Sequence, residues 1–235
     1  MTNFQQAIRM NNDGVQFLVN GEDEKAIPVL SEAFKSMKQH LARAHEDSIT
    51  NASNEAICKS NDQLFVQLPD NNIGEADGTQ TDLSLFNHAM VIPTIDEEHA
   101  CGRVVVVHAA AIIFNLALAH HRKGIRTENL AVTSKALKLY TTILKLLRGG
   151  GDDDLAGSAN MEFLLKLATI SNLLEIQSQF GDYDLIAYER LEQLTRSLRR
   201  KDTMLLDAIL CQTSGVKGQL MSVLLTKPPS VAPAA

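Results

Sequence analysis

The chain has 235 residues, of which 45% are hydrophobic and only 5% aromatic, and its formal net charge is -6. This length and apolar content are enough to bury a core, which excludes wholesale disorder. The acidic charge argues against a nucleic-acid partner, because such binding needs Lys and Arg to displace counterions. A core poor in aromatic residues and rich in Leu, Ile, Val, Ala and Met favours helices over a β-sandwich.

The three cysteines, Cys58, Cys101 and Cys211, lie far apart and form no CxxC pair. This pattern is typical of reduced thiols in an intracellular protein. The first residues contain no apolar stretch, so we expect no secretory signal. We therefore expect a cytoplasmic protein, with the nucleus as the alternative compartment.

In chain order, residues 4–45 are expected to form the first helical hairpin. Apolar residues recur at helical spacing on both sides of the polar turn "GEDE". Pro28 is expected in the first turn of the second helix, where a missing N–H costs little.

Residues 46–100 differ in composition. Pro, Gly, Asn and Asp cluster in "PDNNIGEADGTQTD", between two short apolar runs at 63–68 and 84–92. This arrangement predicts a small antiparallel β-hairpin insertion with a long loop. A short helix at 86–90 is the alternative.

Residues 102–148 are expected to form the second hairpin, which turns at "KGIRTEN". Its first helix contains the apolar run "VVVVHAAAIIFNLALA", interrupted by His108 and Asn115. A membrane span needs about 20 mostly apolar residues, and polar groups inside hydrocarbon are costly. The run therefore predicts a helix buried among other helices, and no membrane partner.

The segment "GGGDDD" then predicts a solvated linker. It lacks the alternating ligands and closing glutamate of a calcium-binding EF-hand loop. Residues 157–201 are expected to form a third hairpin turning at "FGDYD", and a shorter helix follows at 202–212. The prediction is one mainly α domain over 1–226, with about 6–7 helices, and a loose tail at 227–235. The stretch "GQLMSVLLTKPP" is a candidate final strand that would join the β-hairpin.

Each hairpin contains an asparagine nine residues before a glycine. The three pairs are Asn12 and Gly21, Asn115 and Gly124, and Asn172 and Gly181. A glycine can adopt left-handed backbone angles after a helix end, and an asparagine amide can both donate and accept hydrogen bonds. The recurrence indicates repeated helix–turn–helix units, which bury their apolar faces by stacking on their neighbours.

These residues resemble the tetratricopeptide repeat (TPR) family. In the first hairpin, Gly14 takes the small position of the motif, Phe17 the aromatic position, and Ala26, Leu30 and Ala33 the packing positions of the second helix. The second hairpin supplies Asn115, Leu116, Ala117, Gly124, Ala136, Tyr140 and Ile143. The third keeps Asn172, Leu173 and Gly181, but has Leu174 where the motif has a small residue.

The spacing departs from the family. TPR units recur every 34 residues, whereas the three asparagines are 103 and 57 residues apart, so insertions interrupt the repeats. The order of "FVQLP", "FNLALAHH", "KALKLY", "SNLLEI" and "APAA" also resembles a group of uncharacterised, TPR-like algal proteins.

The resemblance implies a concave groove lined by the first helix of each hairpin. It would contain eight polar residues: Asn11, Asn12, Asn115, His121, Arg122, Asn172, Glu175 and Gln179. Amide groups there suit an extended or helical peptide. We therefore expect an intracellular protein–protein interaction scaffold with a protein or peptide partner.

Chaperone-binding TPR domains grip a terminal carboxylate with a set of Lys, Asn and Arg residues. Here only Asn115 stands at its place in that set. Asn11 and Val15 occupy the first-repeat positions, and Ala168 and Asn172 the third-repeat positions. Without Lys or Arg the carboxylate would meet no countercharge, so binding of chaperone tails is not expected.

No catalytic, cofactor or metal motif is visible. The adjacent His120 and His121 point about 100° apart on a helix and cannot share one ion. GxSxG, P-loop and GxGxxG motifs are absent. We therefore predict no catalytic residue, no cofactor and no bound metal. The alternative is a small helical enzyme with a site near the insertion and the second repeat, around His88, His99 and Cys101.

Overall fold

The computed structural model describes residues 2–50, 89–93, 102–147 and 158–179. These residues form helices and no strand, which confirms the prediction of a mainly α fold. The helices are α1 (Asn3–Val19), α2 (Asp23–Thr50), α3 (Gly102–Arg126), α4 (Leu130–Leu146) and α5 (Ser158–Gln179).

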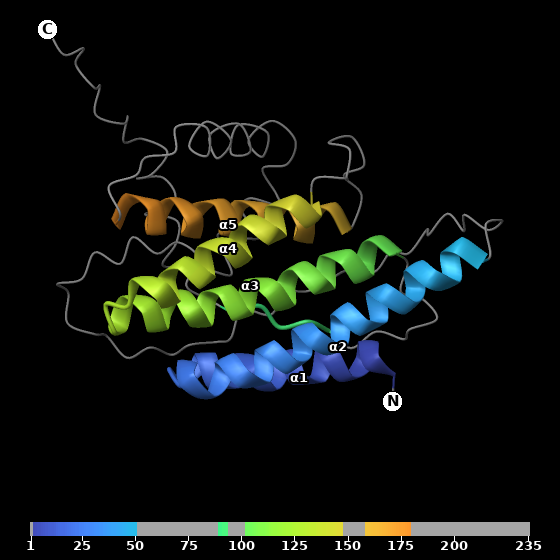
Figure 1. Cartoon of the computed structure of the whole chain (residues 1–235), viewed down its shortest axis with the longest axis horizontal. Helices are drawn as coiled ribbons and strands as arrows, with labels where there is room; N and C mark the ends of the chain where they lie inside the picture. The colour runs from blue at the N-terminus through green and yellow to red at the C-terminus, as the bar shows by residue number, and fades with distance from the viewer. Residues whose placement is uncertain (1, 51–88, 94–101, 148–157, 180–235) are drawn as a thin grey trace, which may run out of the picture.

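The helices are stacked in chain order. α2 packs against both α1 and α3, α4 packs against α3 and α5, and α1 and α5 each also contact α3. In Figure 1 the α1–α2 pair forms the lowest layer, α3 crosses the middle, and α4 and α5 lie above it. α3 therefore packs against the α1–α2 hairpin and also against α4 and α5.

The first hairpin closes tightly around one glycine. Thr2 caps α1 by accepting a hydrogen bond from the Gln5 N–H, and Gly21 makes the turn with a φ of 73°. A Cβ added at Gly14 would lie 2.6 Å from the Leu30 side chain. α1 and α2 therefore cross closely at Gly14, the position at which the resemblance expects a small residue. Pro28 is the sixth residue of α2, which begins at Asp23, so its expected place in the first turn was wrong.

The second hairpin corrects the role expected for Gly124. α3 continues past this glycine to Arg126, and the positive φ of the turn belongs to Glu128, at 50°. A Cβ on Gly124 would lie 2.9 Å from the backbone nitrogen of Thr133. The glycine is therefore needed for close approach between α3 and α4, and not for a left-handed backbone. Asn129 caps α4 by accepting from the N–H groups of Ala131 and Val132.

α3 is enclosed by the rest of the chain. By length and composition alone it could cross a membrane, but 83% of its most apolar 18-residue window is buried within the structure. Its large side chains, such as Phe114 and Ile112, are fully buried. The expectation of a buried central helix is confirmed, while the absence of a membrane partner stays a prediction.

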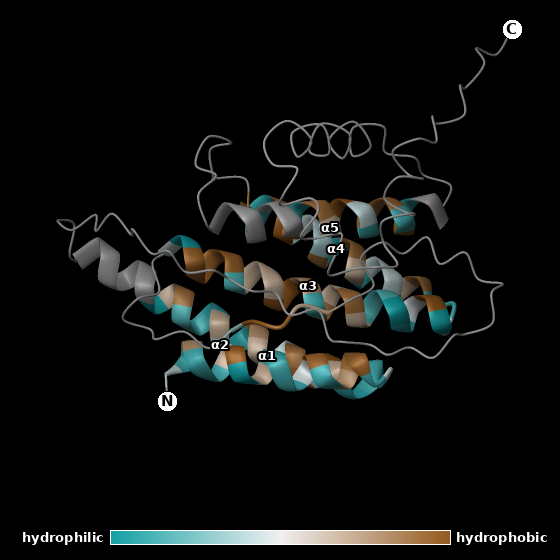
Figure 2. Ribbon diagram, turned by 180° about the vertical axis from the view of Figure 1, so that it is seen from behind, coloured by the Kyte–Doolittle hydropathy of each residue, from teal (hydrophilic) through white to brown (hydrophobic). Residues whose placement is uncertain are grey.

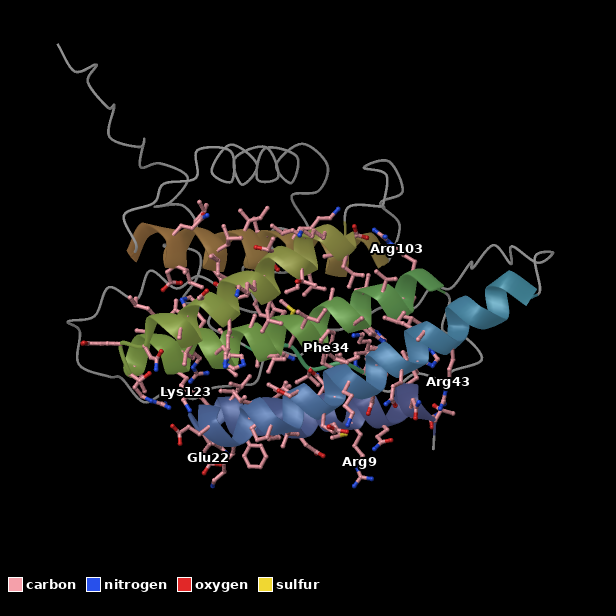
Figure 3. All side chains as sticks on the ribbon, viewed as in Figure 1. Arg9, Glu22, Phe34, Arg43, Arg103 and Lys123 are labelled. Atoms are coloured by element: carbon pink, nitrogen blue, oxygen red, sulfur yellow. The ribbon has the colours of Figure 1, made fainter. Side chains whose placement is uncertain are left out.

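Charged residues tie both ends of α3 to other helices. Near its start, Arg103 forms an ion pair with Glu162 of α5. Near its end, Lys123 lies 3.2 Å from a carboxylate oxygen of Glu24 at the beginning of α2. Figure 3 shows Arg103 beside α5 and Lys123 beside the turn between α1 and α2.

Several expected elements lie outside the described residues. They include most of the insertion at 46–100, the loop at 149–154, the second helix of the third hairpin, the helix at 202–212 and the tail at 227–235. α2 extends to Thr50, and residues 89–93 are described as neither helix nor strand. The β-hairpin therefore stays a prediction.

Candidate functional site

A short apolar segment of the chain, residues 89–93, passes between α1 and α3. It is the thin coloured stretch near the centre of Figure 1 and the brown stretch of Figure 2. Ala89, Met90 and Ile92 are almost fully buried, whereas Val91 and Pro93 are half-buried. Because this segment belongs to no helix, other groups must satisfy its backbone N–H and C=O groups.

Asn115 of α3 bonds both backbone groups of Met90. Its Oδ1 accepts from the Met90 N–H at 2.7 Å, and its Nδ2 donates to the Met90 carbonyl at 2.7 Å. Asn11 of α1 donates to the same carbonyl at 3.3 Å and accepts from Asn115 Nδ2 at 2.9 Å. Both asparagines are 0% exposed, and burial of an amide is tolerated only when it is bonded in this way.

Asn12 makes the same pair of bonds two residues further along the segment, to Ile92. Its Nδ2 donates to the Ile92 carbonyl at 2.8 Å, and its Oδ1 accepts from the Ile92 N–H at 3.0 Å. Asn11 Nδ2 also donates to Asn12 Oδ1 at 3.1 Å. We call Asn11, Asn12 and Asn115 the asparagine row.

The asparagine row acts on the segment as the edge of a β-strand would. In an extended chain the N–H and C=O groups of alternate residues point to the same side. The row pairs with residues 90 and 92 and leaves Val91 between them. Its amides both donate and accept, so they match the N–H and C=O groups of a main chain. The arrangement can therefore pair with an extended main chain.

His121 and Asn172 lie on the other side of α3, around Tyr140. Asn172 Nδ2 donates to the Tyr140 hydroxyl at 3.0 Å. The His121 ring lies edge-on to the Tyr140 ring, with 6.1 Å between the two ring centroids. Burial raises the pKa of Tyr140 and lowers the pKa of His121 to about 4. Both are therefore neutral at pH 7 and pack inside the α3–α4–α5 layer.

Arg122 of α3 connects the second hairpin to the turn of the first hairpin. Its guanidinium donates to the Leu18 carbonyl at 3.0 Å and lies 3.4 Å from the Asp23 carboxylate. Arg126 donates to the same carboxylate at 2.9 Å. Burial raises the pKa of Asp23, and the two arginines oppose that rise. Sequence reasoning missed Asp23 and Arg126, since only the fold brings α2 and α3 together.

The remaining expected residues are also apart from the row. Glu175 is half-buried on α5, where its charge contributes to raising the pKa of Tyr140. The side chain of Gln179 lies outside the described residues. Of the eight residues expected to line one groove, the structure brings Asn11, Asn12 and Asn115 together and places the other described ones elsewhere.

Sequence reasoning also missed the segment that the row binds. The run at 84–92 was visible as apolar and was expected to be a strand paired within the insertion. The available signal was only the unbroken apolar stretch at 89–92, which favours burial. Nothing in the sequence indicated that residues 90 and 92 would pair with side-chain amides of α1 and α3.

Among the described residues, no group of three or more His, Cys, Asp and Glu side chains comes close enough to hold a metal ion. His88, His99 and Cys101, where an enzymatic site was considered, lie outside the described residues, as do Cys58, Cys211 and the three aspartates of 152–154.

Comparisons with known proteins give no match: neither a protein-family model, nor a curated protein, nor a solved structure resembles this chain at a significant level.

Proposed function

We propose that this chain is a TPR-like protein-interaction scaffold that binds an extended peptide along the asparagine row. Two features support the proposal. The α1–α2 hairpin packs on α3 chiefly through α2, and α1 also contacts α3, so the first helices of the two hairpins are neighbours. The row lies between those two first helices and bonds a main chain.

The main support for the proposal is that the row bonds both the N–H and the C=O group of two alternate residues. Asn115 bonds the N–H and C=O of Met90, and Asn12 bonds those of Ile92. Main-chain bonds of this kind supply affinity, and adjoining apolar contacts supply specificity. The same amides suit the interior of a peptide better than a terminal carboxylate, so chaperone tails remain an unexpected ligand.

The proposed partner is a protein or peptide, and the proposed place is the cytoplasm. Neither a cofactor nor a catalytic residue is part of the proposal. The contacts of the described residues supply no argument for the alternative of a small enzyme.

The test is an array of ten-residue peptides probed with the labelled full-length chain. We expect retention of uncharged peptides with apolar residues at alternate positions. Retention is compared in a chain that carries Ile92→Pro, because Asn12 otherwise makes the same two bonds to Ile92 of the chain itself. Asn12→Leu added to this chain removes the two bonds that the half-buried amide offers to a bound main chain while keeping its approximate size, and should weaken retention about tenfold or more, because two hydrogen bonds of about 1 kcal/mol each are lost.

Gln16→Leu is the matched control, because it removes an exposed amide from the same helix. It should leave retention unchanged. If the Asn12→Leu variant keeps its helix content and retains the same peptides as strongly as Ile92→Pro alone, the asparagine row is not the binding surface.

A further inference from the structure

The asparagine row is already occupied by the chain itself. Five hydrogen bonds join it to Met90 and Ile92, and two more join its members to each other. We propose that residues 89–93 are an internal ligand that keeps the site closed until a peptide of the same chemistry displaces them. This inference rests on the proposed function and adds its ligand class and its regulation.

The bonds define the ligand class. The residues at the positions of Met90 and Ile92 must donate an N–H, so proline is excluded at both. Proline is accepted directly afterwards, where Pro93 stands. The buried positions take a small apolar side chain followed by two larger ones at alternate residues, as in Ala89, Met90 and Ile92. The displacing partner is thus an uncharged, extended segment of another protein with this pattern.

Exchange conserves the hydrogen bonds. A peptide with the same backbone groups makes the same five bonds that residues 89–93 make, so neither state leaves an amide of the row unpaired. The balance is then set by concentration. A segment of the same chain competes at an effective concentration on the order of millimolar. The apparent affinity for a free peptide equals the affinity of the open site multiplied by the fraction of sites that are open.

The first experiment measures fluorescence anisotropy of a labelled peptide with the sequence of residues 86–96, added to the full-length chain. Ile92→Pro removes the N–H that bonds Asn12 and the buried isoleucine side chain, which should open the site. We expect this variant to bind the peptide about tenfold more tightly than the wild type or more.

Two controls define the cause. Val91→Pro introduces the same ring one residue away, at the position that the row leaves unpaired, and should bind the peptide as the wild type does. A peptide with Asp at the positions of Met90 and Ile92 should not bind any of the three proteins. Circular dichroism establishes that each variant keeps its helices.

A second measurement uses only the wild type and so does not depend on how the variants fold. Hydrogen exchange is followed at the Met90 and Ile92 amides while the unlabelled peptide is added. Displacement predicts faster exchange at these two amides, with unchanged protection in α1 and α3.

The outcomes separate the two proposals. Peptide binding that speeds exchange at the Met90 and Ile92 amides but is equally tight in the wild type and Ile92→Pro overturns the internal ligand and leaves the proposed function standing. Peptide binding that leaves both amides protected places the peptide away from the asparagine row and overturns both proposals. Absence of binding by the wild type and by a folded Ile92→Pro overturns both. A wild type that is a dimer and dissociates when peptide is added would assign the segment to a second copy, which also overturns the inference.

Discussion

The two sides of α3 use the same residue type for different purposes. On the side of α1, Asn115 bonds the main chain of Met90. On the side of α4 and α5, Asn172 donates to the hydroxyl of Tyr140. Both are buried, and both stand nine residues before a glycine in the sequence.

The difference comes from what covers each helix. An irregular segment lies over Asn115, and its unpaired backbone groups need an amide that donates and accepts at once. A neighbouring helix with its own backbone bonds lies over Asn172, and there the amide bonds a side-chain hydroxyl. The recurrent position therefore does not by itself distinguish an asparagine that bonds a main chain from one that bonds a side chain.

The largest contrast should appear when each asparagine is removed. Asn115→Ala leaves the Met90 N–H and the Asn11 Oδ1 without their partner in a buried place, and should cost about 2–5 kcal/mol of unfolding free energy. Asn172→Ala should cost about 1–2 kcal/mol through the lost bond to Tyr140. Urea unfolding at pH 7 measures both. Equal losses would show that the bound segment adds nothing to the stability of its side of α3.

A second contrast concerns two buried histidines. Burial lowers the pKa of His108, beside Phe4, and of His121, beside Tyr140, to about 4. In the unfolded chain each histidine binds a proton near pH 6.5, whereas in the folded chain it does so only near pH 4. The free energy of unfolding therefore keeps its full value above pH 6.5 and decreases as the pH falls through about 4. Each histidine should account for about 3 kcal/mol of this loss.

Urea midpoints between pH 7 and pH 4 measure the effect. Both ring nitrogens of His108 lack a hydrogen-bond partner among the described residues, so His108→Leu should remove its share of the acid loss without lowering stability at pH 7. If the decrease of the urea midpoint with falling pH is unchanged by His108→Leu, His108 is not a source of the acid loss.

The smallest contrast separates the two hairpin crossings. Gly124→Ala would meet the backbone of Thr133, which cannot move without shifting α4, and should cost about 2–3 kcal/mol. Gly14→Ala meets the Leu30 side chain, which can change rotamer, and also gains helix propensity. Its net cost should be about 1 kcal/mol or less. Thermal melts of the two variants give the order, and the reverse order would indicate that the α1–α2 crossing is the more rigid one.

Much of the fold could be predicted from local pattern. The apolar recurrence predicted α1 and α2, and the run 104–119 predicted a buried helix. The close crossing at Gly14 was expected from the resemblance, which places a small residue there. Local spacing misjudged the turn at Gly124, because a glycine that admits a neighbouring backbone has the same sequence signal as one that adopts a positive φ.

The sequence by itself determined a mainly helical chain with an apolar central helix and three recurrent asparagines, because helical periodicity is a local property. Only the tertiary structure decided that Asn11 and Asn12 meet Asn115 across residues 89–93, which are about 80 residues from α1 in the chain. That choice depended on which backbone groups were left unpaired once α1 and α3 had packed, and no window of sequence contains this information.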